Sequence, residues 1–159
     1  MKNIFNNTLV ILAIVFTSGS VLAQTYAPIP YYQGFESSTN LNSYPSISFT
    51  GFGTFNTEIN STNQPHTGTN HLLMDDGTAD GTDAENYLEI HLDLSGETQV
   101  ELSFFLKDFR DENHVEEGIW MSDDGGVSYY QITTFTPENY SDQSYTRFRL
   151  DVDSVVAAE

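Results

Sequence analysis

The chain has 159 residues, and 23 acidic residues against five Lys and Arg give it a formal net charge of −18 at pH 7. So few cations cannot form the clustered positive surface that binding to a polyanion needs, which excludes nucleic acid as a partner. The chain has no cysteine, so its fold must be held by its core, by bound metal or by both, and a thiol nucleophile is excluded.

The N-terminal segment 1–23 has the pattern of a cleaved secretory signal, with Lys2, an apolar run over 9–16, and small or apolar residues at Val21 and Ala23. This apolar run is shorter than the roughly 20 residues that a membrane span requires. We therefore expect a bacterial protein that is secreted or displayed at the cell surface after cleavage near Ala23, with no membrane span. Residues 24–159 are expected to form one domain, with four cations against all 23 acidic residues.

Short strands are predicted along the whole remaining chain. In Leu88 to Leu94, apolar residues alternate with Glu89, His91 and Asp93, which predicts one buried and one wet face. In the next strand, 100–107, Phe105 breaks the alternation and indicates a central strand covered on both faces. The pattern predicts an all-β, antiparallel β-sandwich of the jelly-roll or concanavalin-like type. The other expected strands are 29–36, 46–57, 70–75, 117–122, 127–135 and 145–152, with long surface loops at 37–45 and 57–71.

Carboxylates are dense in the loop from Asp75 to Glu85, which holds five of them, and more follow the strand 100–107. Calcium is bound by six to eight oxygen ligands and would relieve their mutual repulsion. The spacing matches no EF-hand, so a solvated acidic loop that binds no metal is the alternative. The metal ligands that we predict from this region are Asp75, Asp76, Asp108 and Asp111.

Catalysis is less well supported by the sequence. A secreted polysaccharide hydrolase would need two facing carboxylates, which the same four aspartates could supply. The chain has no Gly-x-Ser-x-Gly motif, and its four histidines lack the spacing of a zinc site. We assign no catalytic residue and keep the hydrolase as the alternative function.

A turn motif is present at Ser122–Tyr129, which matches the Asp-box pattern Ser-x-Asp-x-Gly-x-Thr-Trp with Ser and Tyr at the last two positions. Its aspartate can accept hydrogen bonds from turn amides, and its glycines permit positive φ. One copy cannot build a propeller, so we predict a structural turn formed by Ser122, Asp124 and Gly126.

Aromatic residues near this turn, Trp120, Tyr129 and Tyr130, are candidates for a flat platform on which sugar rings stack. Aromatic residues that alternate along strands more often belong to the core, and Trp120 stands between Ile119 and Met121. The sequence therefore leaves a ligand platform and a core position open for these three residues.

Several short segments, taken in order, resemble the MAM-like jelly-roll modules of secreted bacterial multidomain proteins. They are Gly34-Phe35-Glu36, Pro65-His66-Thr67-Gly68, His71-Leu72-Leu73-Met74, Leu88–Ser95, Val100–Phe104 and Gly118–Ser122.

This resemblance implies an adhesion or carbohydrate-binding module attached to other domains of one polypeptide. It also implies a structural calcium near the first strand, with Glu36 as carboxylate ligand and oxygens from Thr67 and Asn70. Such modules close with a strand that ends in an aspartate pair. The segment Val155–Glu159 lacks that pair, so we expect a fragment without its last strand or strands. Together these features predict a non-catalytic, calcium-stabilised module that recognises an extracellular glycan or protein.

Overall fold

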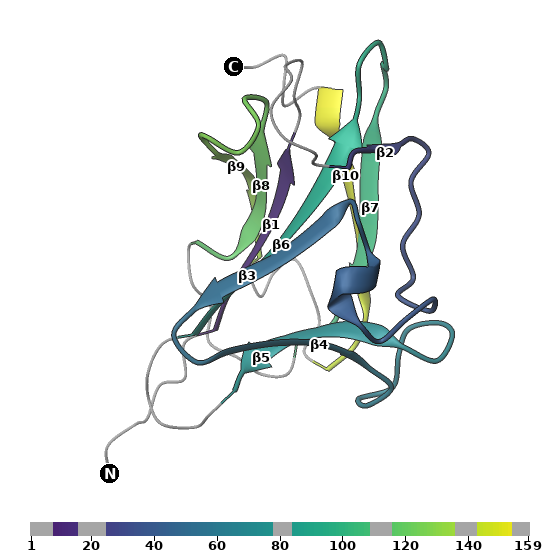
Figure 1. Cartoon of the computed structure of the whole chain (residues 1–159), viewed down its shortest axis with the longest axis vertical. Helices are drawn as coiled ribbons and strands as arrows, with labels where there is room; N and C mark the ends of the chain where they lie inside the picture. Colours follow the sequence, from purple (N-terminus) through teal and green to yellow (C-terminus); the bar gives the residue numbers. More distant parts are fainter. Residues whose placement is uncertain (1–7, 16–24, 78–83, 109–115, 136–142, 154–159) are drawn as a thin grey trace.

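A computed structural model describes residues 8–15, 25–77, 84–108, 116–135 and 143–153, with the backbone alone described for 8–15. These residues are almost entirely strands and connecting segments (Figure 1). None of the helical residues in these ranges forms a helix long and apolar enough to cross a membrane. The prediction of an all-β chain with antiparallel sheets is confirmed.

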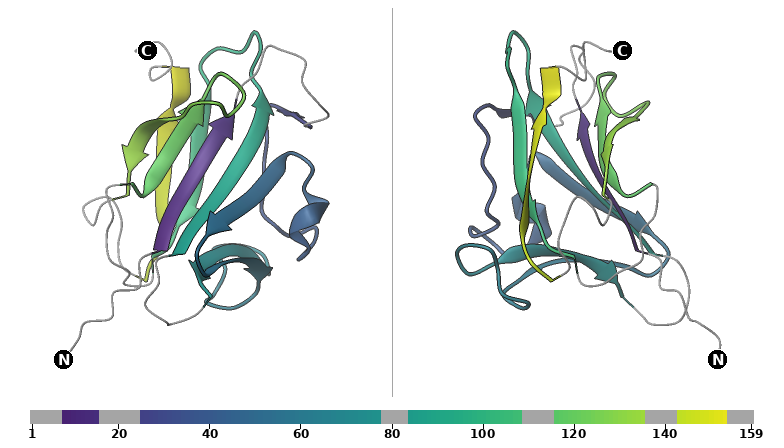
Figure 2. Two further views of the ribbon diagram at one scale, coloured as in Figure 1. Left: turned by 60° about the vertical axis from the view of Figure 1, so that its left-hand side comes forward. Right: turned by 180° about the vertical axis from the view of Figure 1, so that it is seen from behind.

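The largest sheet has six strands and mixed direction. β3 (Ile47–Phe52) is antiparallel to β6 (Ala84–Asp93), and β9 (Tyr130–Thr134) is antiparallel to β8 (Gly118–Ser122). β1 (Thr8–Val15) lies between β6 and β8 and runs parallel to both. The short β2 (Ala27–Pro28) also joins β6 in parallel. Figure 2 shows β1 filling the middle of this sheet.

Two antiparallel strand pairs complete the fold. β7 (Glu101–Leu106) pairs with β10 (Thr146–Asp151), and β4 (Phe55–Asn60) pairs with β5 (His71–Asp76). A 3-10 turn, η1 (Leu41–Ser43), is capped by Asn40, whose side chain accepts a hydrogen bond from the backbone N–H of Asn42 at 3.1 Å.

The main core lies between the six-stranded sheet and the β7–β10 pair. Leu88 and Ile119 of the large sheet are buried together with Phe135 and Phe148. The ring of Phe148 stacks on Phe104 with centroids 5.1 Å apart, and it meets Phe135 edge-on at 5.3 Å. Burying a side chain of this size contributes roughly 1.5–3 kcal/mol relative to leaving it exposed. This aromatic cluster therefore joins the two sheets.

The predicted strands are mostly present, with two differences near the start of the domain. Residues 29–36 form no strand, since β2 ends at Pro28 and Pro30 cannot donate a backbone hydrogen bond to a ladder. Residues 46–57 divide into β3 and β4, since Gly53, with φ of 67°, turns the chain between them. β4 continues to Asn60, so the second predicted loop is shorter, 61–70.

Two predictions about burial are wrong, and tertiary contacts explain both. β7 belongs to a two-stranded sheet, so it is not central, and Phe105 is 46% exposed with its ring stacked 3.6 Å from His66. His91 stands on the face predicted to be wet, yet it is only 3% exposed. The ring of Tyr26 packs edge-on against His91, with centroids 6.1 Å apart, and helps to cover it. Alternation along one strand cannot reveal such covering by distant residues.

Candidate functional site

The side of the six-stranded sheet that points away from β7 and β10, here called the outer face, carries a mixed polar and aromatic surface. Because side chains alternate along a strand, the buried Leu88 puts Tyr87 and Glu89 on the outer face of β6. On β3, Ser48 is directly opposite Glu89. Ala13 of β1 is in register with both Glu89 and Trp120, so Trp120 of β8 shares this face.

Glu89 is the centre of a hydrogen-bonded network on the outer face. Its Oε1 accepts a hydrogen bond from the Tyr129 hydroxyl at 2.8 Å, and its Oε2 accepts one from the Ser48 hydroxyl at 2.9 Å. Ser48 Oγ also lies 3.0 Å from Nε2 of His91. Burial raises the pKa of Tyr129, and its hydrogen bond to Glu89 raises it further. The network therefore joins the β8–β9 side of the sheet to β3 through one carboxylate.

Ser48 is also in contact with His91. The Ser48 hydroxyl donates to Glu89 Oε2, and the tautomer of the His91 ring decides which atom donates between Nε2 and Ser48 Oγ. Burial lowers the pKa of His91, with partial opposition from Glu89, whose Oε2 is 3.9 Å from Nε2. The arrangement is suited to holding β3 and β6 in register and to offering polar groups to a ligand.

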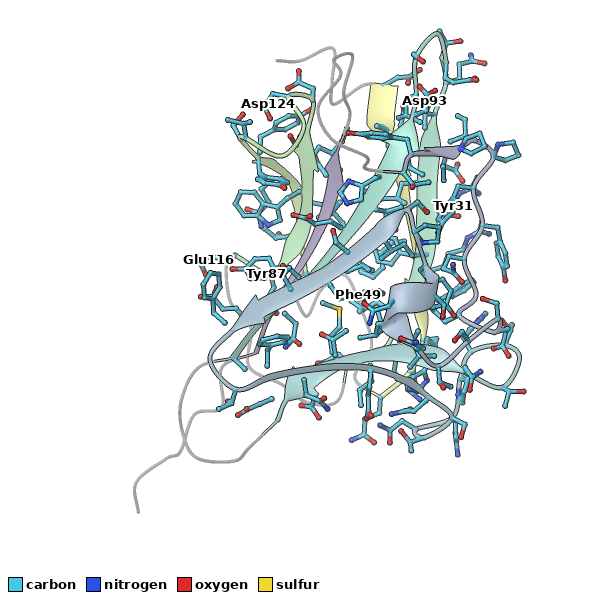
Figure 3. All side chains as sticks on the ribbon, viewed as in Figure 1. Tyr31, Phe49, Tyr87, Asp93, Glu116 and Asp124 are labelled. Carbon is cyan, nitrogen blue, oxygen red and sulfur yellow. The ribbon has the colours of Figure 1, made fainter. Side chains whose placement is uncertain are left out.

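Aromatic side chains surround this network on the outer face. Tyr129 is 37% exposed and Phe52, at the end of β3, is 69% exposed. The Phe52 ring meets the Tyr87 ring edge-on at 6.1 Å. The indole N–H of Trp120 donates to the carbonyl of Glu116 at 3.1 Å, and the ring is half-buried rather than in the core. Figure 3 labels Tyr87 and Glu116, which lie toward one side of the molecule.

Tyr130 does not belong to this surface. It is in register with the fully buried Met121, and both pack with Val152 in a second core cluster. Of the three predicted platform residues, the structure thus brings Trp120 and Tyr129 to the outer face and places Tyr130 on the opposite side of the sheet.

The predicted turn at 122–129 connects β8 to β9, with Asp124 at its tip (Figure 3). Asp124 Oδ1 accepts hydrogen bonds from the amides of Val127 at 3.0 Å and Ser128 at 2.9 Å, and from the Ser122 hydroxyl at 2.8 Å. The Ser122 hydroxyl oxygen accepts from the amide of Gly126 at 2.8 Å, and Gly126 has φ of 85°. Hydrogen bonds, first of all from the Ser128 hydroxyl, hold the pKa of Asp124 below its ordinary value. Ser122, Asp124 and Gly126 thus all act within the turn.

Glu36 binds the loop that precedes β5. Its Oε1 accepts from the amides of Thr69 at 3.0 Å and Asn70 at 2.8 Å. Gly68, with φ of 71°, lies so close that an added Cβ would be 2.4 Å from Glu36 Oε1. Thr67 is exposed in the same loop. The structure therefore places Glu36 against the loop that contains Thr67 and Asn70, the other two residues that the family resemblance implies for calcium.

Of the four predicted aspartate ligands, the three that the structure describes, Asp75, Asp76 and Asp108, do not form one group. Asp75 and Asp76 end β5, where the Asp76 carboxylate accepts from the Thr54 hydroxyl. Asp108 follows Lys107, which lies over the Tyr145 ring, and Tyr145 Oη is 3.3 Å from Nδ1 of His71 at the start of β5. Asp111 lies outside the described residues.

Across the part of the chain that the structure describes, no group of three or more His, Asp or Glu side chains is placed to hold a metal ion.

The sequence alone did not single out Glu89 or Ser48. The alternation over 87–91 places Tyr87, Glu89 and His91 on one face, but any solvent-facing strand has such a pattern. The informative signal is the cross-strand position of Ser48 opposite Glu89, which requires the register of β3 against β6. A local pattern cannot supply that register.

Comparison with protein families, with characterised proteins and with solved structures finds no match for this chain.

Proposed function

We propose that the protein is a non-catalytic extracellular binding module with a jelly-roll β-sandwich related to the MAM-like modules, and that it binds a glycan on its outer face. The observation that carries the proposal is the Glu89 network beside exposed aromatic rings. Sugar rings have apolar faces that stack on aromatic side chains and hydroxyls that need hydrogen-bond partners. Trp120 and Tyr129 offer aromatic rings for stacking, and Glu89 and Ser48 offer hydrogen-bond partners.

The charge of the chain narrows the class of glycan. With a formal net charge of −18 and Glu89 at the centre of the outer face, the protein repels sulfated and uronic-acid polymers. A neutral polysaccharide carries no such penalty. We therefore infer a neutral glycan, with a protein surface as the other class of ligand for the same face.

Calcium is the second part of the proposal, and it rests on Glu36. Two carboxylate oxygens provide about four lone-pair sites, so the amides of Thr69 and Asn70 leave capacity for a cation. Glu36 and residues 67–69 are exposed and Asn70 is half-buried, and oxygens of Thr67 and Asn70 are the further ligands that we propose. A cation there would tie the segment before η1 to β5 and stabilise the fold by mass action.

The test of glycan binding is affinity electrophoresis of the protein in gels that contain neutral polysaccharides, followed by titration calorimetry with the best ligand. Trp120→Ala is expected to weaken binding about tenfold, equivalent to ~1.4 kcal/mol. The matched control is Tyr32→Ala, because Tyr32 is 83% exposed on the segment between β2 and η1 and lies off the outer face. Equal affinities for the two variants would contradict the proposed face.

The same panel of glycans distinguishes the binding module from the alternative, a polysaccharide hydrolase. A binding module migrates more slowly in the gel and releases no reducing ends, whereas a hydrolase releases them with turnover. If reducing ends appear, Asp75→Asn, Asp76→Asn and Asp108→Asn identify the residues responsible, and the non-catalytic proposal is wrong.

A further inference from the structure

The outer face continues along β3 and β6 beyond the Glu89 network. These two strands are antiparallel neighbours, so residues that are opposite each other in the ladder share a face. On the outer face they form three successive rows, here called the β3–β6 strip. The rows are Ser48 with Glu89, Thr50 with Tyr87, and Phe52 with Glu85. The proposed glycan contacts involve the first row, and the other two rows extend the same surface toward the end of β3.

The third row of the strip repeats the chemistry of the first. Glu85 accepts a hydrogen bond from the hydroxyl of Tyr87, as Glu89 accepts one from Tyr129. Burial raises the pKa of Tyr87, and its hydrogen bond to Glu85 raises it further, so the hydroxyl keeps its proton at neutral pH. The Phe52 ring, 69% exposed, packs edge-on against Tyr87. Each end of the strip therefore has a carboxylate that holds a tyrosine hydroxyl.

The two carboxylates are too far apart for one sugar ring to contact both. Glu85 and Glu89 belong to the same strand, and a strand advances by about 3.3 Å per residue, so their backbone positions are roughly 13 Å apart. In the row between them, the exposed Thr50 adds a hydroxyl opposite Tyr87. The strip is therefore long and narrow, with polar groups in every row, and it fits several sugar rings joined in an extended chain.

We propose that Phe52, Glu85 and Tyr87 form a second glycan subsite, so that the outer face binds an extended, unbranched chain of neutral sugars and distinguishes ligands by their length. This subsite depends on the proposed glycan-binding function, which it extends from a single point of contact to a strip. Joining two weak contacts in one ligand raises the affinity through effective concentration, provided that the ligand spans both subsites. A short oligosaccharide occupies one subsite only.

β-Linked glucose chains have the chemistry that such a strip requires. Their ring hydroxyls are equatorial, so each ring has apolar faces that can stack on aromatic side chains and an edge of hydroxyls that can donate to carboxylates. They carry no charge, whereas an acidic polysaccharide would be repelled by Glu85 as well as by Glu89. Cello-oligosaccharides and laminari-oligosaccharides, from the disaccharide to the hexasaccharide, are therefore the probes.

The test is titration calorimetry of the full chain with each oligosaccharide. The wild type is expected to bind the hexasaccharide of one series about tenfold more tightly than its disaccharide. Phe52→Ala should weaken hexasaccharide binding about fivefold and leave disaccharide binding unchanged, whereas Trp120→Ala should weaken both. Phe105→Ala is the matched control, because Phe105 is an exposed phenylalanine of β7, in the other sheet. Melting temperatures of the variants verify that each one is folded.

The results that would overturn the second subsite differ from those that would overturn glycan binding. Equal affinities of the wild type for disaccharide and hexasaccharide would leave glycan binding in place and remove the second subsite. Equal hexasaccharide affinities of Phe52→Ala and Phe105→Ala would do the same. If no oligosaccharide binds but a neutral polysaccharide slows the protein in the gel, the extended glucose chain is the wrong ligand and only this inference fails. If neither binds, both proposals are wrong.

Discussion

Asp124 and Glu36 use a carboxylate in the same way but over very different distances along the chain. Asp124 accepts hydrogen bonds from groups at most four residues away, in Ser122, Val127 and Ser128. Glu36 accepts from the amides of Thr69 and Asn70, which are 33 and 34 residues away. The first carboxylate shapes a turn, and the second joins two separate segments of the fold.

The difference has consequences for stability and for metal binding. A local turn forms with little loss of chain entropy, so its carboxylate mainly selects the turn geometry. A contact across more than thirty residues closes a long loop, and it is formed only when the surrounding sheets are in place. Glu36 is therefore the carboxylate whose environment depends on the tertiary fold, and it is the one at which we propose that calcium binds.

Gly68→Ala is expected to have the largest effect, because it disrupts the long-range contact directly. The new Cβ would be 2.4 Å from Glu36 Oε1, and the residue must also keep φ of 71°. We expect a loss of about 2–3 kcal/mol in the free energy of unfolding, measured by urea denaturation. Gly96→Ala is the matched control, since Gly96 has φ of 80° but nothing within 4 Å of an added Cβ. Equal losses would show that only backbone strain matters and that the Glu36 contact contributes nothing.

Asp124→Asn is expected to have the next largest effect, through the local turn. In the folded protein, the Ser128 hydroxyl and neighbouring donors keep the pKa of Asp124 below its ordinary value of 3.8. The unfolded chain binds the proton near the ordinary value, so the stabilisation is complete above that pH and is lost as the pH falls toward the folded value. Melting temperatures between pH 6 and pH 2 should fall less steeply for Asp124→Asn than for the wild type.

The control for this pH experiment is Asp123→Asn, which removes an adjacent exposed carboxylate from the same turn. It should leave the acid slope of the wild type nearly unchanged. Identical slopes for all three proteins would show that the hydrogen bonds of Asp124 do not stabilise the fold.

Glu36→Gln should have a smaller effect on stability, about 1 kcal/mol, because the amide keeps one acceptor for the Thr69 and Asn70 N–H groups. The Glu36→Gln variant also tests whether calcium binds at this site. We expect excess calcium to raise the melting temperature of the wild type above its value in chelator, by mass action. The shift should be lost in Glu36→Gln and retained in Asp75→Asn, since Asp75 lies on β5 away from this loop. A wild type that melts equally with calcium and with chelator would remove calcium from the proposed function.

Tyr129→Phe should have the smallest effect on stability, at most about 1 kcal/mol, because it removes one partly exposed hydrogen bond. Glu89 differs from Asp124 and Glu36, which also accept from backbone amides, in that it accepts hydrogen bonds from the side chains of Tyr129 and Ser48. A carboxylate held by side chains can exchange them for ligand hydroxyls. We therefore expect glycan affinity, measured by calorimetry, to change more than the melting temperature does, and the reverse result would assign the network to structure.

Particular residues show how far the sequence could predict this site. The Asp124 turn was readable because all of its partners lie within seven residues of sequence with fixed spacing. The prediction that Glu36 is a metal ligand came from a family resemblance, since no local sequence pattern distinguishes this residue. The opposite orientations of Trp120 and Tyr130 depend on how β8 pairs with β9, where the register shifts between Ile119 and Trp120. Adjacent aromatic residues alone cannot show which of them faces the core.

By itself, the sequence determined the β class, most of the strands, the acidic surface and the Asp124 turn, because strand periodicity and turn chemistry act over a few residues. Only the tertiary structure decided that His91 is buried, that Phe105 is exposed, that Glu89 connects Tyr129 to Ser48, and that β1 lies between β6 and β8. These outcomes depend on register and on packing between segments that are 40 or more residues apart. Short-range patterns carry no information about such pairings, since they are selected by the burial and hydrogen bonding of the whole sheet.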